Sequence, residues 1–114
     1  MTPSRDLPAC PVATTLSLIG NKWKILIMRD VLDGPKRYGQ LRQSLEGISQ
    51  KVLTENLRGM EADGLLTRTV FPEVPPRVEY AVSPVGESMR PIILQMAEWG
   101  TNYKRMLREQ EAMA

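Results

Sequence analysis

The spacing of hydrophobic residues along the chain predicts five helical segments. Apolar side chains recur every three or four positions in residues 11–20, 22–32, 36–45, 49–63 and 84–110, which is the period of one face of an α-helix. The second segment is apolar over more than one face, so we expect it to lie at the centre of a helical core.

Helix 49–63 has well-marked ends in the sequence. Ser49 can cap its first turn, and Ile48 and Leu53 have the spacing of a hydrophobic staple across that cap. Gly64 suits the left-handed conformation that ends many helices. Together with the segment before it, this helix predicts a helix-turn-helix over residues 36–63.

Two stretches after this motif have the period of β-strands. Residues 65–71 and 77–83 alternate in character, and the loop between them has three prolines within residues 72–77. The pattern predicts a β-hairpin over residues 65–83, with a loop that is stiff and poor in backbone donors. The expected fold is therefore α+β and mainly α: a winged helix-turn-helix in which the hairpin is the wing, followed by a long C-terminal helix.

The last segment, 84–110, has a heptad-like stripe. Its apolar and aromatic residues are alternately four and three positions apart, a spacing that predicts a packing seam with another helix. Part of the stripe can instead pack on the protein's own core, and Pro91 is expected to kink the helix. The stripe consists of Val85, Met89, Ile92, Met96, Trp99, Tyr103 and Met106.

Length and composition narrow the class of protein. With 114 residues, 42% of them hydrophobic, residues 1–114 are expected to form a single domain. One cysteine and no histidine exclude intrachain disulfides, zinc ribbons and histidine-dependent catalysis. We therefore expect no enzyme activity, metal or cofactor. Residues 1–10 lack the long apolar stretch of a signal peptide, and no later apolar run approaches the roughly 18 residues of a membrane span, so a cytoplasmic location without membrane association is expected.

Charge is concentrated on the helix-turn-helix. The whole chain has a net charge of +2, whereas residues 36–58 contain five cations and two acids. A rotation of 100° per residue places Gln50, Lys51, Thr54 and Arg58 on the outer face of helix 49–63. This face can be a solvated surface, but amide, hydroxyl and cationic groups are also what a helix needs to bind base edges and phosphates in the major groove.

Several motifs resemble the HxlR-type family of winged-helix regulators, relatives of the MarR group. Cys-Pro, Leu-Ile-Gly-x-Lys-Trp, Gly-Ile-Ser-x-Lys-x-Leu-Thr, Asp-Gly-Leu and Pro-Pro-Arg-Val-Glu-Tyr occur in the family's order, and the match covers roughly residues 10–100. One departure is Asn21, where the family commonly has a second glycine.

The resemblance implies a homodimeric transcriptional regulator, most often a repressor, that binds double-stranded DNA at an inverted-repeat operator. It implies that helices 10–20 and 84–110, with the heptad-like stripe, form the dimer interface. The DNA-binding role falls on the helix-turn-helix and the wing, through Lys36, Arg37, Ser49, Gln50, Lys51, Thr54, Arg58 and Arg77.

Cys10 is the candidate for chemistry. It precedes a helix N-terminus, whose partial positive charge favours the reactive thiolate. In redox-sensing members of the family the corresponding cysteine is the sensor, which nominates Cys10 for reaction with an oxidant or electrophile. The alternative is a buried, inert thiol. Because the chain has a single cysteine, any protein disulfide must join two chains.

Two other functions fit parts of this pattern. A thiol-dependent redox enzyme could use Cys10 as its nucleophile, although the sequence offers it neither a histidine base nor a resolving thiol. A protein-interaction module could use the polar face of helix 49–63 to bind another protein. Turnover of an oxidant would support the first, and loss of partner binding in the presence of duplex DNA would distinguish the second.

Overall fold

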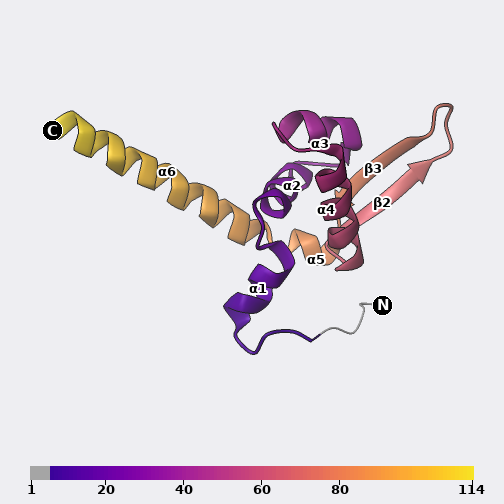
Figure 1. Cartoon of the computed structure of the whole chain (residues 1–114), viewed down its shortest axis with the longest axis horizontal. Coiled ribbons are helices and arrows are strands. Elements are labelled where there is room, and N and C mark those ends of the chain that lie inside the picture. The colour runs from indigo at the N-terminus through magenta and orange to yellow at the C-terminus, as the bar shows by residue number, and fades with distance from the viewer. Residues whose placement is uncertain (1–5) are drawn as a thin grey trace.

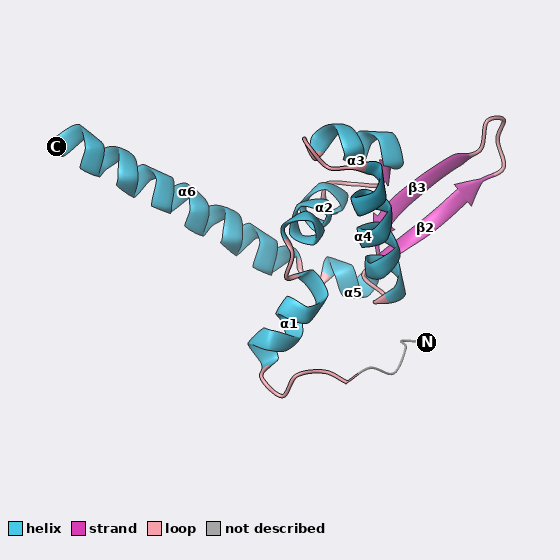
Figure 2. Cartoon of the chain, viewed as in Figure 1, coloured by secondary structure: helices cyan, strands magenta, loops and turns pink. Residues whose placement is uncertain are grey.

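The computed structural model describes residues 6–114, so residues 1–5 of the predicted domain lie outside the described residues. The chain is mainly helical with a small antiparallel sheet, which confirms the predicted fold class (Figure 2). The elements are α1 (Pro11–Ile19), α2 (Lys22–Leu32), β1 (Lys36–Arg37), α3 (Tyr38–Ser44), α4 (Gln50–Ala62), β2 (Leu66–Phe71), β3 (Arg77–Val82), α5 (Pro84–Glu87) and α6 (Arg90–Met113).

The core forms where α2, α3 and α4 meet, because each helix turns an apolar face inward. Helix α2 lies at its centre, as its wide apolar coverage predicts, and contacts α1, α3, α4, α6 and β3. The largest fully buried side chains come from these three helices and from the C-cap of α3, Leu45: Ile27, Met28, Val31, Leu41, Leu45, Leu53, Leu57 and Met60.

A polar link joins α2 to α4 beside this core. Asn21 caps α2 by accepting a hydrogen bond from the Lys24 backbone N–H at 2.8 Å, and its amide donates to Asn56 Oδ1 of α4 at 2.9 Å. The Asn56 amide in turn donates to the Val52 carbonyl at 2.8 Å. Asn21, the departure from the family pattern, therefore fixes the position of α4 as well as the start of α2.

The turn between α3 and α4 has the predicted local geometry. Gly47 has φ of +88°, a conformation that residues with a Cβ rarely adopt. Ser49 accepts a hydrogen bond from the Val52 backbone N–H at 3.1 Å, and Ile48 and Leu53 are both buried. These contacts confirm the predicted cap and hydrophobic staple, and they set the angle at which α4 leaves the turn.

The wing is a hairpin of β2 and β3, extended by a short strand that sequence periodicity does not predict. The pairing runs in register from Leu66 opposite Val82 to Phe71 opposite Arg77. Strand β1 pairs with β3 on its other edge, giving the order β1-β3-β2. Two residues are too few to produce a recognisable alternation, so residues 36–37 were expected to belong to the following helix.

The expected single helix over residues 84–110 is wrong in one respect, because the chain forms two helices there. Helix α5 ends at Glu87, and α6 runs from Arg90 to Met113 with Pro91 in its first turn. Proline is compatible with a first helical turn, where its missing N–H is not needed. At this break the side chain of Met89 points into the protein's own core, where it is 7% exposed.

Two elements project from the helical body (Figure 1). The wing extends on one side, and α6 extends on the other, well beyond the helices that it contacts. The described chain is accordingly elongated, with principal extents of 59 × 39 × 24 Å. Only Ile93 of α6 is buried, so most of a helix of 24 residues lies outside the core.

Candidate nucleic-acid interface

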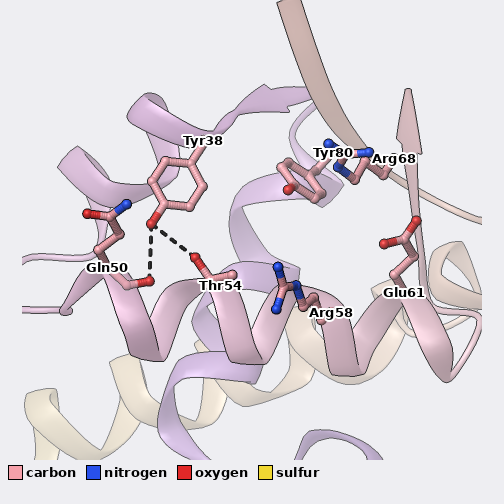
Figure 3. A pocket seen from close by; sticks show the side chains of 7 residues that line it. All are labelled: Tyr38, Gln50, Thr54, Arg58, Glu61, Arg68 and Tyr80. Atoms are coloured by element: carbon pink, nitrogen blue, oxygen red, sulfur yellow. Dashed lines mark hydrogen bonds between the residues drawn. The ribbon is translucent and has the colours of Figure 1, made fainter. Parts of the chain in front are cut away.

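The outer face of α4 meets the wing in an open cleft of about 610 Å³ (Figure 3). Helix α4 supplies the floor, α3 borders one end, and strands β2 and β3 border the other. The residues that line the cleft are polar, charged or aromatic: Tyr38, Gln50, Thr54, Arg58, Glu61, Arg68 and Tyr80.

Two arginines in this cleft have no carboxylate partner. Arg58 comes from α4 and Arg68 from β2, and both are exposed. Within residues 6–114, neither guanidinium makes an ion pair or a hydrogen bond. Glu61 is the one acidic residue that lines the cleft. The arrangement leaves two planar cations available to an external anion, and guanidinium groups suit phosphate well.

Arg77, the other arginine predicted to bind DNA, has a different environment. Its Nε donates to Glu73 at 2.6 Å, its Nη1 donates to Glu79, and its guanidinium lies 3.8 Å from the centre of the Phe71 ring. The hydrogen bond to Glu73, followed by the one to Glu79, raises the pKa of Arg77 above its ordinary value. The structure therefore places Arg77 in a wing cluster of its own, apart from the cleft.

The remaining predicted DNA-binding residues divide between two places. Ser49, the N-cap of α4, and Lys51 in its first turn are exposed on either side of Gln50, which lines the cleft. Lys36 lies in β1, where its Nζ is 3.8 Å from Asp33 Oδ2 and it borders a separate cleft beside α2 and α3. Arg37 is exposed next to it. The structure does not bring Lys36 together with the α4 side chains.

The sequence did not assign four residues of the cleft to the site. Tyr38 and Tyr80 belong to the apolar pattern of their elements, and Glu61 and Arg68 are charged residues of a helix and a strand that periodicity alone does not single out. The feature that could have identified Arg68 and Tyr80 is the register of the hairpin. It pairs these two residues across the strands and so places a cation and an aromatic hydroxyl on the same side of the wing.

The exposed part of α6 has the opposite chemistry. Five of the seven predicted stripe residues are exposed on α6, with Trp99 at 69%, whereas Met89 is buried in the core and Val85 lies on α5. The Trp99 and Tyr103 rings stack with centroids 5.3 Å apart. A shallow groove of about 590 Å³ runs along this face, lined by Ile92, Met96, Trp99 and their polar neighbours.

Cys10 is exposed immediately before α1 and is the N-cap residue of that helix. Its carbonyl accepts hydrogen bonds from the backbone N–H and the hydroxyl of Thr14. Helix α1 itself exposes Val12 and Leu16, which are 68% and 57% accessible. The thiol is thus open to solvent in a single chain and lies next to a second apolar surface.

Comparison with known proteins identifies the family. The HxlR-like helix-turn-helix model matches residues 18–108. The chain belongs to this family. The HTH-type transcriptional regulator YdeP of Bacillus subtilis strain 168, which is uncharacterized, is 42% identical over 109 residues that cover 96% of this chain and 85% of YdeP.

Solved structures of similar proteins agree with the fold described above. The oxidized form of the redox regulator HypR is 45% identical, with a TM-score of 0.79 over 82% of this chain and 96% of HypR. The reduced form of HypR is 42% identical, with a TM-score of 0.82 over 88% of this chain and 99% of HypR. The winged-helix architecture of the chain is therefore that of an HTH-type transcriptional regulator.

Two other kinds of site are absent from the described residues. Residues 6–114 contain no cluster of three or more His, Cys, Asp or Glu side chains that could hold a metal ion. Nor does this part of the chain include a helix with the length and apolarity needed to cross a membrane.

Proposed function

We propose that this protein is a DNA-binding transcriptional regulator that acts as a homodimeric repressor at an inverted-repeat operator in the cytoplasm. The observation that carries the proposal is the pair of unpartnered arginines, Arg58 and Arg68, in the same cleft as the polar side chains of Gln50 and Thr54. Helix α4 would enter the major groove, and its amide and hydroxyl groups would meet base edges. Phosphates on either side would bind the two guanidinium groups.

The other predicted DNA-binding residues take supporting places in this proposal. Ser49 and Lys51 sit at the N-terminal end of α4, which enters a groove first in such motifs. Lys36 and Arg37 would contact the backbone at the edge of the site. Arg77 can reach a phosphate only after exchanging a carboxylate for it, because Glu73 and Glu79 hold it in the free protein.

The exposed face of α6 supports the dimer. Burying a large apolar side chain contributes about 1.5–3 kcal/mol as an upper figure, and five stripe residues lie exposed on this helix. Doubled in a symmetric interface, such burial can offset an association cost of roughly 4–15 kcal/mol. A twofold axis through α6 would present two copies of α4 to half-sites about one helical turn, or a multiple of it, apart.

Cys10 is the proposed point of regulation by an oxidant or electrophile. Its thiol is exposed and precedes the helix α1, and a relative of similar fold is a redox regulator studied in oxidized and reduced forms. Two thiols lose two electrons and two protons to an oxidant when an interchain disulfide forms. An electrophile would instead add to one thiolate. Either product lies beside the proposed α1 surface of the dimer.

Operator binding tests the proposal. Duplexes selected from a random pool by the reduced protein should contain an inverted repeat, and affinity should fall steeply with salt because bound phosphates release counterions. Arg58→Ala should weaken binding and lower the salt slope by about 1. The matched control is Arg108→Ala, which removes the same charge from the exposed end of α6. An unchanged affinity and slope for Arg58→Ala would contradict the proposal.

The regulatory role of Cys10 has its own test. Treatment of the protein with diamide should change operator affinity in the wild type and should leave it unchanged in Cys10→Ser. Non-reducing electrophoresis shows whether the product is a disulfide-linked dimer. An equal response of the two proteins to diamide would exclude Cys10 as the sensor and would leave the DNA-binding proposal intact.

A further inference from the structure

Tyr38 connects the start of α3 to the outer face of α4 through its hydroxyl group. Its Oη lies 3.1 Å from the backbone carbonyl oxygen of Gln50 and 3.3 Å from Thr54 Oγ1 (Figure 3). Both partners belong to the first turns of α4, and Gln50 and Thr54 also line the cleft. The phenol oxygen is therefore in contact with a side chain that the proposed function places against DNA.

The number of available hydroxyl protons determines which group donates in each of these two hydrogen bonds. A carbonyl oxygen can only accept, and a phenol has one proton to donate. Both contacts are satisfied at once only when Tyr38 donates to the Gln50 carbonyl and accepts from the Thr54 hydroxyl. The one proton of Thr54 then points at Tyr38. Both distances exceed the roughly 2.7–2.8 Å usual for hydroxyl donors, so the pair of bonds mainly orients Thr54 and adds little to stability.

We infer that Tyr38 makes Thr54 a one-way acceptor, so that Thr54 selects an exocyclic amino group in the major groove. A threonine hydroxyl can ordinarily donate or accept and so distinguishes bases poorly. With its proton committed to Tyr38, Thr54 Oγ1 offers only lone pairs to the cleft. The amino groups of adenine N6 and cytosine N4 can donate to it, whereas guanine O6 and N7 and thymine O4 cannot.

This inference rests on the proposed function, because it needs α4 to lie in the major groove. Tyr38 acts as a positioning residue, and Thr54 makes the contact. The ring of Tyr38 packs against the hydrophobic core, so phenylalanine at this position keeps the packing and removes only the hydroxyl. The loss of that one group frees the Thr54 proton and restores both directions of hydrogen bonding.

The experiment measures base preference at each position of a selected operator. Each half-site position is replaced in turn by the other three base pairs, and the affinity of wild type, Tyr38→Phe, Thr54→Val and Thr54→Ser is measured. One half-site position should depend on Thr54, so that its base preference disappears in Thr54→Val. At that position the wild type should favour adenine or cytosine by roughly threefold to tenfold, the size of one neutral hydrogen bond. Thr54→Ser should keep this preference.

Tyr38→Phe should reduce the same preference to within about twofold, while other positions of the operator keep theirs. Tyr80→Phe is the matched control, because Tyr80 borders the same cleft and its hydroxyl has no hydrogen bond within residues 6–114. Any change in affinity caused by Tyr80→Phe should be equal for the four bases at the Thr54 position. Circular dichroism establishes that each variant is folded.

Three results would overturn the inference while DNA binding stands. The first is a Thr54-dependent position that favours guanine or thymine, the second is an operator in which no position depends on Thr54, and the third is a Tyr38→Phe variant that keeps the full wild-type preference. If Tyr38→Phe does not fold, the comparison of Thr54→Val with Thr54→Ser still shows which base edge Thr54 selects. Failure of the wild type to bind any selected duplex would overturn the proposed function and the inference together.

Discussion

Helices α4 and α6 both expose a patterned face, and these two faces have opposite chemistry. The outer face of α4 is polar and cationic, with Arg58 unpaired. The outer face of α6 is apolar and includes Trp99, which is 69% exposed. Water solvates the polar face of α4 at little cost in free energy, whereas contact of the apolar face of α6 with water is unfavourable. The exposed chemistry therefore favours a polyanion as the binding partner of α4 and a protein surface as the binding partner of α6.

The largest expected effect comes from placing a charge in the apolar face of α6. Met96→Glu should convert the proposed dimer to a monomer, because a carboxylate cannot be buried there without a partner. Operator affinity should then fall by roughly 100-fold or more, since two linked half-site contacts become one. Sedimentation velocity gives the mass, and a binding titration gives the affinity. Val74→Glu, the same change at a fully exposed wing residue, should leave the mass unchanged.

A comparison of two wing arginines sharpens the assignment of the cationic surface. Arg68→Gln should lower operator affinity about tenfold and the salt slope by about 1, because an unpaired guanidinium binds phosphate directly. Arg77→Gln should have a smaller effect, since two carboxylates already hold Arg77. Titrations at several salt concentrations measure both quantities. Equal losses for the two variants would show that Arg77 leaves its glutamates on binding.

Releasing Arg77 should act in the opposite direction. Glu73→Gln removes one carboxylate from the wing cluster, and with it one negative charge from the side of the protein that we propose faces DNA. We expect affinity to rise about twofold to fivefold through reduced repulsion of phosphate. The Glu109→Gln variant carries the same change of charge on an exposed part of α6. A fall in affinity for Glu73→Gln would mean that the cluster is needed to hold the wing in its binding shape.

The support behind α4 gives a moderate effect on stability. Asn21→Ala removes the cap of α2 and leaves the buried Asn56 without its 2.9 Å hydrogen bond. The free energy of unfolding should fall by about 1–2 kcal/mol, as measured by urea denaturation. Gln43→Ala, an exposed amide in α3, should change it by less than about 0.5 kcal/mol. Equal effects would mean that α2 does not support α4 through Asn21.

The smallest effect is expected at the joint between the two regions. Arg90 donates to the Leu32 carbonyl of α2 at 2.9 Å and to Glu87, and the latter bond lowers the Glu87 pKa from its ordinary value of 4.5. Because the pKa of Glu87 is lowered by folding, its ionised form stabilises the folded state at pH values above the ordinary pKa. This contribution is lost as the pH falls through the lowered pKa. Because both side chains are nearly half exposed, the effect is small.

Urea denaturation between pH 7 and pH 3 tests this joint. The difference in stability between wild type and Glu87→Gln should be largest near neutral pH and should shrink as the pH falls. Glu109→Gln is again the control, since Glu109 makes no ion pair within the described residues. A difference that does not depend on pH would show that Glu87 acts through packing.

Most of the fold was predictable because its signals are short in range. Ser49 and Gly64 mark the ends of α4, and the hydrogen bond from the Leu65 N–H to the Met60 carbonyl closes the helix as the local pattern indicates. The hairpin followed from alternation on both sides of a proline-rich loop. The division between α5 and α6 was predicted only as a kink at Pro91, because one heptad-like pattern continues across it.

The candidate site was predictable only in part. Periodicity identified the face of α4 that contains Gln50, Thr54 and Arg58, since a helix rotates its residues by a known angle. It could not select Arg68 over Arg77, because the two differ in which side chains surround them after folding. A charge count treats both as cations, whereas the structure shows one unpaired and one held by two glutamates.

The amino-acid sequence by itself determined the helices, the hairpin, the turn glycines and the family, since periodicity, caps and motifs act within a few residues. Tertiary structure alone decided which groups meet. Tyr38 reaches Thr54 sixteen positions away, Arg68 lies beside Tyr80 across the hairpin, and Met89 turns inward from an otherwise exposed stripe. Such contacts depend on the angles at which packed elements cross, and those angles are set by the whole core.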